Sequence, residues 1–175
     1  MPRASSASDP LAALRADVRA EAVRAPFDVC RETYAAAGRA PSEPVLAAGA
    51  LDAPVCFLGR ELGREEVHAG EPLVGAGGRR LRRAVHEALL GPAAPAERRF
   101  AGVLEHVLLT NMVPYRPVGN RAYSRATVDR FRPFVEHLLG RLWTGRRLVA
   151  LGEHAFLWLA TYAAPGAVAS GRAER

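Results

Sequence analysis

Residues 55–63 read VCFLGRELG, a short apolar run that is closed by a glycine-rich turn. Two similar apolar runs follow along the chain, at residues 107–109 and 148–151. Short apolar runs bounded by turn residues are typical of strands that are buried on both faces of a sheet. The pattern therefore predicts three buried parallel strands, at residues 55–58, 107–109 and 148–151.

Helical stretches separate these runs. We expect one helix at about residues 77–90 and another at about 125–140, which Ser124 introduces as an N-cap. A further helix should start near Gly152. Strands that alternate with helices indicate a parallel sheet covered on both faces. The predicted fold class is therefore α/β, with three layers in the order α/β/α and a short central parallel sheet.

The N-terminal part of the chain is predicted to be helical and then irregular. Asp9 followed by Pro10 indicates an N-cap with proline in the first turn of a helix. Pro26 should bend or end that helix, and residues 27–37 are consistent with its resumption. Residues 38–54 are rich in glycine and proline, a composition that predicts a loop.

The length of 175 residues suits one domain with a full hydrophobic core. We expect a single domain over residues 9–162, preceded by a disordered segment at 1–8 and followed by an irregular tail at 163–175. Hydrophobic residues make up 49% of the chain and charged residues 24%, which is the balance of a soluble globular protein.

Targeting and cysteine signals are weak. No apolar run approaches the roughly 18 residues needed to cross a bilayer, and the N-terminus lacks the apolar core of a signal peptide. We therefore expect a cytoplasmic protein that is neither secreted nor inserted in a membrane. Cys30 and Cys56 lie far apart without a partner at metal-ligand spacing, so neither a zinc site nor a disulfide framework is indicated.

The net charge is +6, and the chain carries arginine but no lysine. Arginine pairs with phosphate through two parallel hydrogen bonds, so a nucleic acid is a reasonable partner. The same arginine-rich and alanine-rich composition also follows from a high-GC genome. Charge alone leaves both explanations open.

Glycine-rich turns follow the predicted strands, at the place where ligands gather in parallel sheets. The turns span residues 59–63, 70–78, 110–121 and 150–152. Glycine at a strand end lets backbone amides approach a ligand closely. Each turn taken alone is also typical of ordinary turn chemistry, whereas their order and mutual spacing are more specific.

Together these turns resemble the uracil-DNA glycosylase superfamily, and most of all its branch that typically carries an iron-sulfur cluster. The Phe-Arg-Pro-Phe segment at residues 131–134 corresponds to a further motif of that branch. The chain is identified as a divergent member of the superfamily. The resemblance implies a DNA repair glycosylase that flips uracil out of DNA and hydrolyses its N-glycosidic bond.

The resemblance implies that Gly59, Leu73 and Asn111 bind uracil. The amide of Asn111 offers a donor and an acceptor that suit O4 and N3–H of uracil, while a turn-capping role is the alternative. Leu73 stands where the family stacks an aromatic ring on the base, so it covers the base more weakly or is an ordinary core leucine. We expect the turns to form a slot in which Asn111 lies close to residues 59–63 and faces solvent.

The resemblance also implies that Glu61 and Arg60 are catalytic. Arg60 stands where the iron-sulfur branch usually has glutamate, and it would supply positive charge near the leaving base. Glu61 follows at the place where other members carry the aspartate that positions water. A carboxylate there orients the water and stabilises an oxocarbenium-like transition state. The alternative for Glu61 is a solvated loop charge, and Glu65 and Glu66 are predicted to be helix-start or solvated charges.

A DNA-backbone site is implied by the turn Arg-Pro-Val-Gly-Asn-Arg, with the candidate residues Arg116, Gly119, Asn120 and Arg121. Solvated arginines are the alternative. A basic run at residues 79–83 extends this surface or forms a solvated helix face. The expected partner is DNA, single- or double-stranded, and we expect a monomer.

The iron-sulfur cluster of the branch is not expected in this chain. Tyr115 and Phe131 replace two of the cluster cysteines, and no pair of cysteines precedes the first predicted strand. Four thiolates are normally needed to hold such a cluster. We predict no cofactor, with Tyr115 and Phe131 filling the volume by apolar packing.

The C-terminal end departs from the family pattern. Members usually have a fourth strand and a His-Pro-Ser motif, whereas this chain reaches Arg175 roughly where the segment leading to that strand should begin. His154 lies at the wrong place in the pattern and is expected on a helix surface or in packing. Loss of the motif's histidine would lower the rate, so a non-catalytic DNA- or uracil-binding remnant is the alternative. A nucleotide-binding domain unrelated to repair is a third reading.

Overall fold

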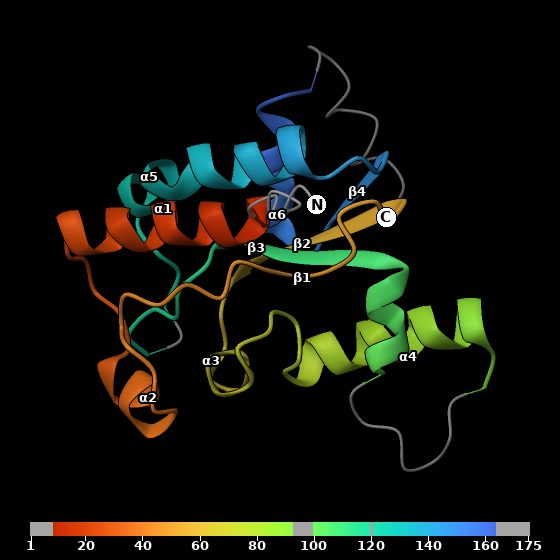
Figure 1. The fold of residues 1–175 in the computed structure, drawn as a ribbon, viewed down its shortest axis with the longest axis horizontal. Coiled ribbons are helices and arrows are strands. Elements are labelled where there is room, and N and C mark those ends of the chain that lie inside the picture. The colour runs from red at the N-terminus through yellow and green to blue at the C-terminus, as the bar shows by residue number, and fades with distance from the viewer. Residues whose placement is uncertain (1–8, 93–99, 120, 164–175) are drawn as a thin grey trace, which may run out of the picture.

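A four-stranded sheet lies between two layers of helices in the computed structural model, which describes residues 9–92, 100–119 and 121–163 (Figure 1). The segment predicted to be disordered, residues 1–8, and residues 164–175 of the predicted tail lie outside these ranges. Within the described ranges, no helix combines the length and apolar character that a membrane span requires.

The sheet contains all three predicted strands. They are β2 (Val55–Glu61), β3 (Val107–Val113) and β4 (Arg147–Ala150). β2 lies between the other two and is parallel to both. The prediction of parallel strands is thus confirmed, and the strands extend further toward the carboxyl end than the apolar runs alone.

The predicted number of visible strands is wrong. A short strand, β1 (Ala47–Gly49), pairs antiparallel with β3 and forms the edge of the sheet, in the order β1-β3-β2-β4. This segment was predicted to be part of a loop over residues 38–54. The Thr110 hydroxyl donates to the Leu46 carbonyl at 2.7 Å and helps to hold β1 in place.

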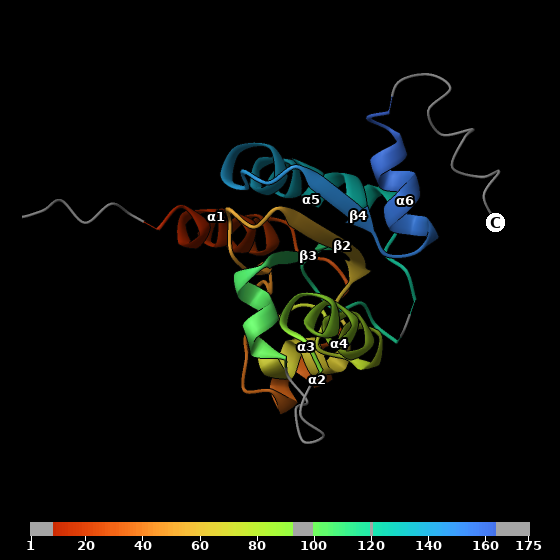
Figure 2. The same cartoon turned by 90° about the vertical axis from the view of Figure 1, so that its right-hand side faces the viewer.

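The helices form the two outer layers, as Figures 1 and 2 show. One face of the sheet is covered by α1 (Pro10–Arg24), α5 (Arg125–His137) and α6 (Glu153–Ala160), and a π-helical turn, η2 (Leu138–Leu142), continues α5. The other face is covered by α4 (Ala76–Leu90) and the 3-10 helix η1 (Ala101–Glu105). Two short helices, α2 (Arg31–Ala36) and α3 (Arg64–Ala69), lie on the α4 side (Figure 2).

Local sequence signals explain the helix boundaries. Asp9 and Ser124 cap α1 and α5 as predicted, because their side chains accept from Leu11 N at 2.9 Å and from Thr127 N at 3.2 Å. α1 ends just before Pro26, and the chain becomes helical again only at α2.

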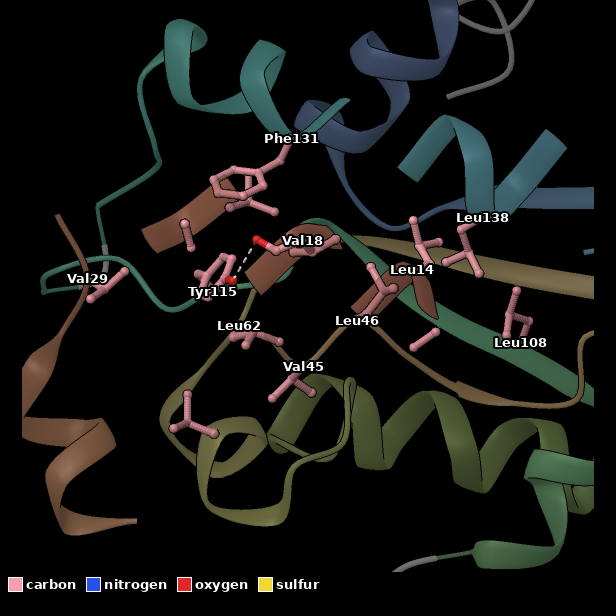
Figure 3. Packing of buried hydrophobic residues seen from close by; sticks show 14 of the residues in the cluster. Leu14, Val18, Val29, Val45, Leu46, Leu62, Leu108, Tyr115, Phe131 and Leu138 are labelled. Atoms are coloured by element: carbon pink, nitrogen blue, oxygen red, sulfur yellow. Dashed lines mark hydrogen bonds between the residues drawn. The ribbon is translucent and has the colours of Figure 1, made fainter. Parts of the chain in front are cut away.

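Strand alternation divides the core. Cys56 and Leu58 of β2 point toward the layer of α1, α5 and α6, whereas Phe57 points toward α4. The largest cluster lies between the sheet and α1, where Leu14 and Val18 pack against strand and loop residues (Figure 3). This packing fixes the positions of the strand tips, where the candidate site lies.

Candidate active site

Gly59 and Asn111 lie side by side at the tips of β2 and β3, where the strand register pairs them. Asn111 Oδ1 lies only 2.2 Å from the place that a Cβ on residue 59 would take. Any larger side chain at that position would displace the amide. Glycine is therefore required here because of close approach, and the predicted proximity of Asn111 to the 59–63 turn is correct.

The predicted openness of Asn111 to solvent is wrong in this structure. Asn111 is only 1% exposed, and its Oδ1 has no hydrogen-bond partner among the described residues. A buried acceptor without a partner costs about 1–3 kcal/mol. The site therefore contains a buried acceptor whose hydrogen bond is not made within the described residues.

Leu73 accounts for part of the burial of Asn111. Its Cδ2 lies 3.3 Å from the same would-be Cβ of Gly59, so the leucine methyl group and the Asn111 amide both lie over this glycine. Leu73 has φ of 56°, a left-handed conformation that is costly for a side chain of this size. The structure thus brings together the three residues that were predicted to bind the base.

Buried Arg82 holds the backbone at Leu73. Its side chain donates to the carbonyl oxygens of Leu73 and Pro72, each at 2.8 Å, and forms an ion pair with Glu71 at 2.6 Å. Arg82 is 1% exposed, so the prediction that it belongs to a solvated face or a DNA-binding surface is wrong. The basic residue is instead the anchor of the loop before α4.

A cleft of about 610 Å³ opens beside this loop, within the size range of about 300–1,000 Å³ that ligand sites occupy. It is lined by the turn after β2, the start of α4, Leu73 and Arg116. Glu66 also lines it and is buried, and its carboxylate accepts from Gly75 N at 2.9 Å. Glu66 lies in the first turn of α3, in agreement with the predicted helix-start position, but it is buried and not solvated.

Leu73 lines the cleft and also lies over Gly59 beside Asn111, so we expect Leu73→Ala to open a path to the amide. Hydrogen exchange of the Asn111 side-chain amide, measured by nitrogen-15 NMR, should accelerate by about ten-fold or more. Leu81→Ala is the matched control, because Leu81 packs in the same cluster but is not among the nearest neighbours of a Cβ on Gly59. Equal exchange in both variants would contradict the covering role of Leu73.

Glu61 and Arg60 form an ion pair at the end of β2. The Glu61 side chain is 8% exposed and that of Arg60 is 38% exposed. Burial raises the pKa of Glu61 above its ordinary value, against the opposing effects of Arg60 and of His154 on α6. Glu61 is therefore a desolvated carboxylate and not the solvated loop charge that was its alternative. His154 is on a helix surface, as expected, and close enough to influence Glu61.

The predicted DNA-backbone residues are only partly brought to the cleft. Arg116 lines it, and its backbone N–H donates to the Tyr34 hydroxyl at 3.3 Å. Gly119 and Arg121 are exposed on the loop that follows, and Gly119 has φ of 67°. Asn120 lies outside the described residues.

At the two positions that correspond to cluster cysteines, the aromatic rings of Tyr115 and Phe131 pack against each other. Both side chains are fully buried, and their ring centroids lie 5.2 Å apart (Figure 3). The centroid of the Phe27 ring lies 5.1 Å from that of Tyr115 and 5.0 Å from that of Phe131. The Tyr115 hydroxyl donates to the Ser42 carbonyl at 2.9 Å. These side chains supply no thiolate, so this position does not fit an iron-sulfur cluster.

Two comparisons with known proteins agree with the family resemblance of the sequence. The family model described as "Uracil DNA glycosylase superfamily" matches residues 46–173. The chain is also 32% identical over 104 residues to a protein of Pyrobaculum aerophilum named "Type-4 uracil-DNA glycosylase". That alignment covers 59% of this chain and 46% of the relative, so the match spans less than half of the relative's length.

Proposed function

The chain belongs to the uracil-DNA glycosylase superfamily, with similarity to its iron-sulfur-type branch, and from this premise we propose that it excises uracil from DNA. The reaction is hydrolysis of the N-glycosidic bond after the nucleotide has been flipped out of the strand. The observation that carries the proposal is the buried Asn111 Oδ1 beside Gly59, which accepts no hydrogen bond from the residues that the structure describes.

Asn111 reads the base in this proposal. Its Oδ1 accepts from N3–H of uracil and its amide nitrogen donates to O4. Binding would supply a hydrogen bond that no described residue gives to Oδ1, and this favours a ligand with an N–H group at that place. Leu73 must move from Asn111 to admit the base and then covers its face.

Glu61 orients the attacking water in this proposal. A desolvated carboxylate accepts the water proton as the bond to the sugar C1′ forms, while the bond from C1′ to uracil N1 breaks. The electron pair of that bond leaves with uracil. Arg60 lies against Glu61, so its charge is near the reacting centre and offsets the negative charge that builds on the base.

DNA is the proposed partner. Arg116 lies at the cleft, and Gly119 and Arg121 are exposed on the segment that follows it, so these residues are suited to phosphate groups on either side of the flipped nucleotide. Asn120 keeps its predicted role in the same backbone contact. The net charge of +6 favours association with a polyanion.

A second candidate is binding of uracil-containing DNA without catalysis. Its supporting observation is the ion pair between Glu61 and Arg60, since a carboxylate that is held by a neighbouring guanidinium is less available to water. In this second function Asn111 still binds the base and Arg116 still binds a phosphate, but Glu61 does not activate water.

The test is to incubate protein from a host without its own uracil-DNA glycosylase with an oligonucleotide that carries one uracil. Abasic sites are detected by alkaline cleavage on a denaturing gel, and an oligonucleotide with thymine in place of uracil is the control. We expect cleavage of the uracil strand alone. Asn111→Ala should lower the rate on the order of 100-fold, because two hydrogen bonds of about 1.5 kcal/mol each are lost.

Equal cleavage of both oligonucleotides would contradict the assignment of uracil as the substrate. If the uracil strand is bound in preference to the thymine strand but no abasic site forms, the second candidate replaces the first. The bound fraction is measured by fluorescence anisotropy of the same labelled oligonucleotides.

A further inference from the structure

A second hollow, of about 480 Å³, lies beside the start of β1 and outside the candidate active site. Three arginines line it, Arg15 and Arg19 of α1 and Arg39 of the loop after α2, together with one carboxylate, that of Glu43. The positive charges therefore outnumber the negative charge. The volume lies in the range of about 300–1,000 Å³ that ligand sites occupy, so the hollow is suited to an anion.

Arg15 and Arg19 project from the same face of α1, because they lie one helical turn apart. The Arg15 side chain donates to the Ala47 carbonyl at 3.0 Å, so its guanidinium is held at the start of β1. Arg19 is exposed, and its side chain forms no ion pair with any residue that the structure describes. The charge of Arg19 is therefore available to a ligand.

Arg39 reaches the same hollow from a different part of the chain. Its Nη2 pairs with the Glu43 carboxylate at 2.6 Å. Its Nη1 lies where a Cβ on residue 70 would have to fit, so this close approach requires Gly70, which also has a φ of 68°. These two contacts hold the guanidinium at the hollow before a ligand binds, and such preorganisation lowers the cost of binding.

The hollow and the cleft of the candidate active site are neighbours. Gly70 lines the hollow and donates its N–H at 2.9 Å to the carbonyl of Glu66, which lines the cleft. Val45 of the hollow donates its N–H to the Pro114 carbonyl at 3.0 Å, and Arg116 of the cleft follows two residues later. α3 connects the two linings, and its six residues span about 9 Å. One strand of DNA presents about two or three phosphates over that length.

We propose that the hollow binds a backbone phosphate of the DNA strand, a few nucleotides away from the flipped uracil. This inference rests on the proposed function, which gives DNA as the partner. Arg19 donates charge-assisted hydrogen bonds to the phosphate oxygens, and Arg15 and Arg39 add positive charge beside them. Contacts of this kind set the register of a strand and do not read its sequence. The DNA-binding surface therefore extends past the cleft to α1.

The salt dependence of DNA binding tests the inference through Arg19→Gln. Fluorescence anisotropy is measured over a series of salt concentrations with the single-stranded thymine oligonucleotide, which carries the same phosphates as the uracil strand. Each phosphate contact contributes about 0.7 to the slope of log K against log salt concentration on a single strand, so the slope should be smaller by about that amount. Binding should weaken several-fold, and the melting temperature should not change because Arg19 is exposed.

Arg146→Gln is the matched control. It removes the same charge from an exposed side chain directly before β4, at the amino end of the parallel strands. The hollow lies near their carboxyl ends, where Val45 contacts the segment after β3. The slope for Arg146→Gln should therefore equal that of the wild type.

A free anion is the other source of a phosphate group, and the Nε–H of Arg39 distinguishes it from DNA. This group is buried, so its signal can be followed by nitrogen-15 NMR. We expect the oligonucleotide to shift the signal. Inorganic phosphate at the same concentration of phosphate groups should leave it in place.

Three results would overturn the inference. They are a wild-type slope for Arg19→Gln, an equal loss of slope for Arg146→Gln, and an Arg39 signal that inorganic phosphate shifts as much as the oligonucleotide does. The proposed function fails separately. If Arg19→Gln lowers the slope but the wild-type protein does not cleave the uracil strand, the hollow remains a DNA-binding site of a protein with another activity.

Discussion

Glu61→Gln is expected to lower kcat for uracil release by about 100- to 10,000-fold, the range in which a positioned general base acts. Glutamine keeps the shape of the side chain but cannot take the water proton. Steady-state cleavage of the uracil oligonucleotide across a pH series measures the effect. Glu87→Gln is the control, because Glu87 is likewise paired with an arginine, Arg83, but has no role in the proposed reaction.

The pH profile gives this prediction a second readout. Burial raises the pKa of Glu61, so wild-type kcat/KM should fall on the acid side at a pH above the ordinary range of carboxylates. The residual activity of Glu61→Gln should lack that acid limb. If kcat/KM of Glu61→Gln still fell at the same acidic pH, the ionisation would belong to a group other than Glu61.

The stability of the Glu61→Gln protein follows from the same shift. Because the folded-state pKa is raised, the protonated form favours folding below that pKa, and this contribution is lost as pH rises through it. Glutamine does not ionise, so the variant should be no less stable than the wild type at neutral pH. A large loss of stability would mean that the activity loss reflects unfolding.

Arg82→Met should lower the free energy of unfolding by about 3–6 kcal/mol, because a buried charged group loses two hydrogen bonds of about 1.5–3 kcal/mol each. The substitution leaves Glu71 and the carbonyls of Pro72 and Leu73 without their donor. Urea unfolding followed by circular dichroism measures the change. The same contacts hold Leu73 at positive φ, so we expect the backbone at Leu73 to become more mobile and the Leu73 side chain to cover Gly59 less well.

The neighbouring arginine provides the control for Arg82. Arg83 is 66% exposed and pairs with Glu87 one helical turn away, an arrangement that contributes about 0.3–0.5 kcal/mol. Arg83→Met should therefore change stability by less than about 1 kcal/mol. Similar losses in the two variants would contradict the anchoring role of Arg82.

The sequence predicted the central strands well because their apolar runs are short, buried and closed by turns. It missed β1 because Ala47, Ala48 and Gly49 carry neither branched nor aromatic side chains, and β1 forms through pairing with β3. For α3, a helix of six residues that is too short to show a hydrophobic period, the sequence offered only Glu65 and Glu66 as possible helix-start charges.

The sequence predicted which residues of the candidate site lie together, but not which of them are buried. The closeness of Gly59 and Asn111 follows from parallel strands whose tips meet at one edge. Leu73 lies over Gly59 beside Asn111 with a left-handed backbone, and a leucine does not signal that conformation in a sequence. Arg82 resembled its solvated neighbours, and only the fold shows that it faces inward.

The aromatic cluster of Phe27, Tyr115 and Phe131 has a consequence for how this corner of the molecule is assembled. Hydrocarbon rings need no loading machinery and no supply of iron, and air does not degrade them as it degrades metal-bound sulfur. The junction between the N-terminal helices and the strand tips can therefore form in the same step as the rest of the core. This corner of the protein should keep its shape in the presence of chelators and oxidants.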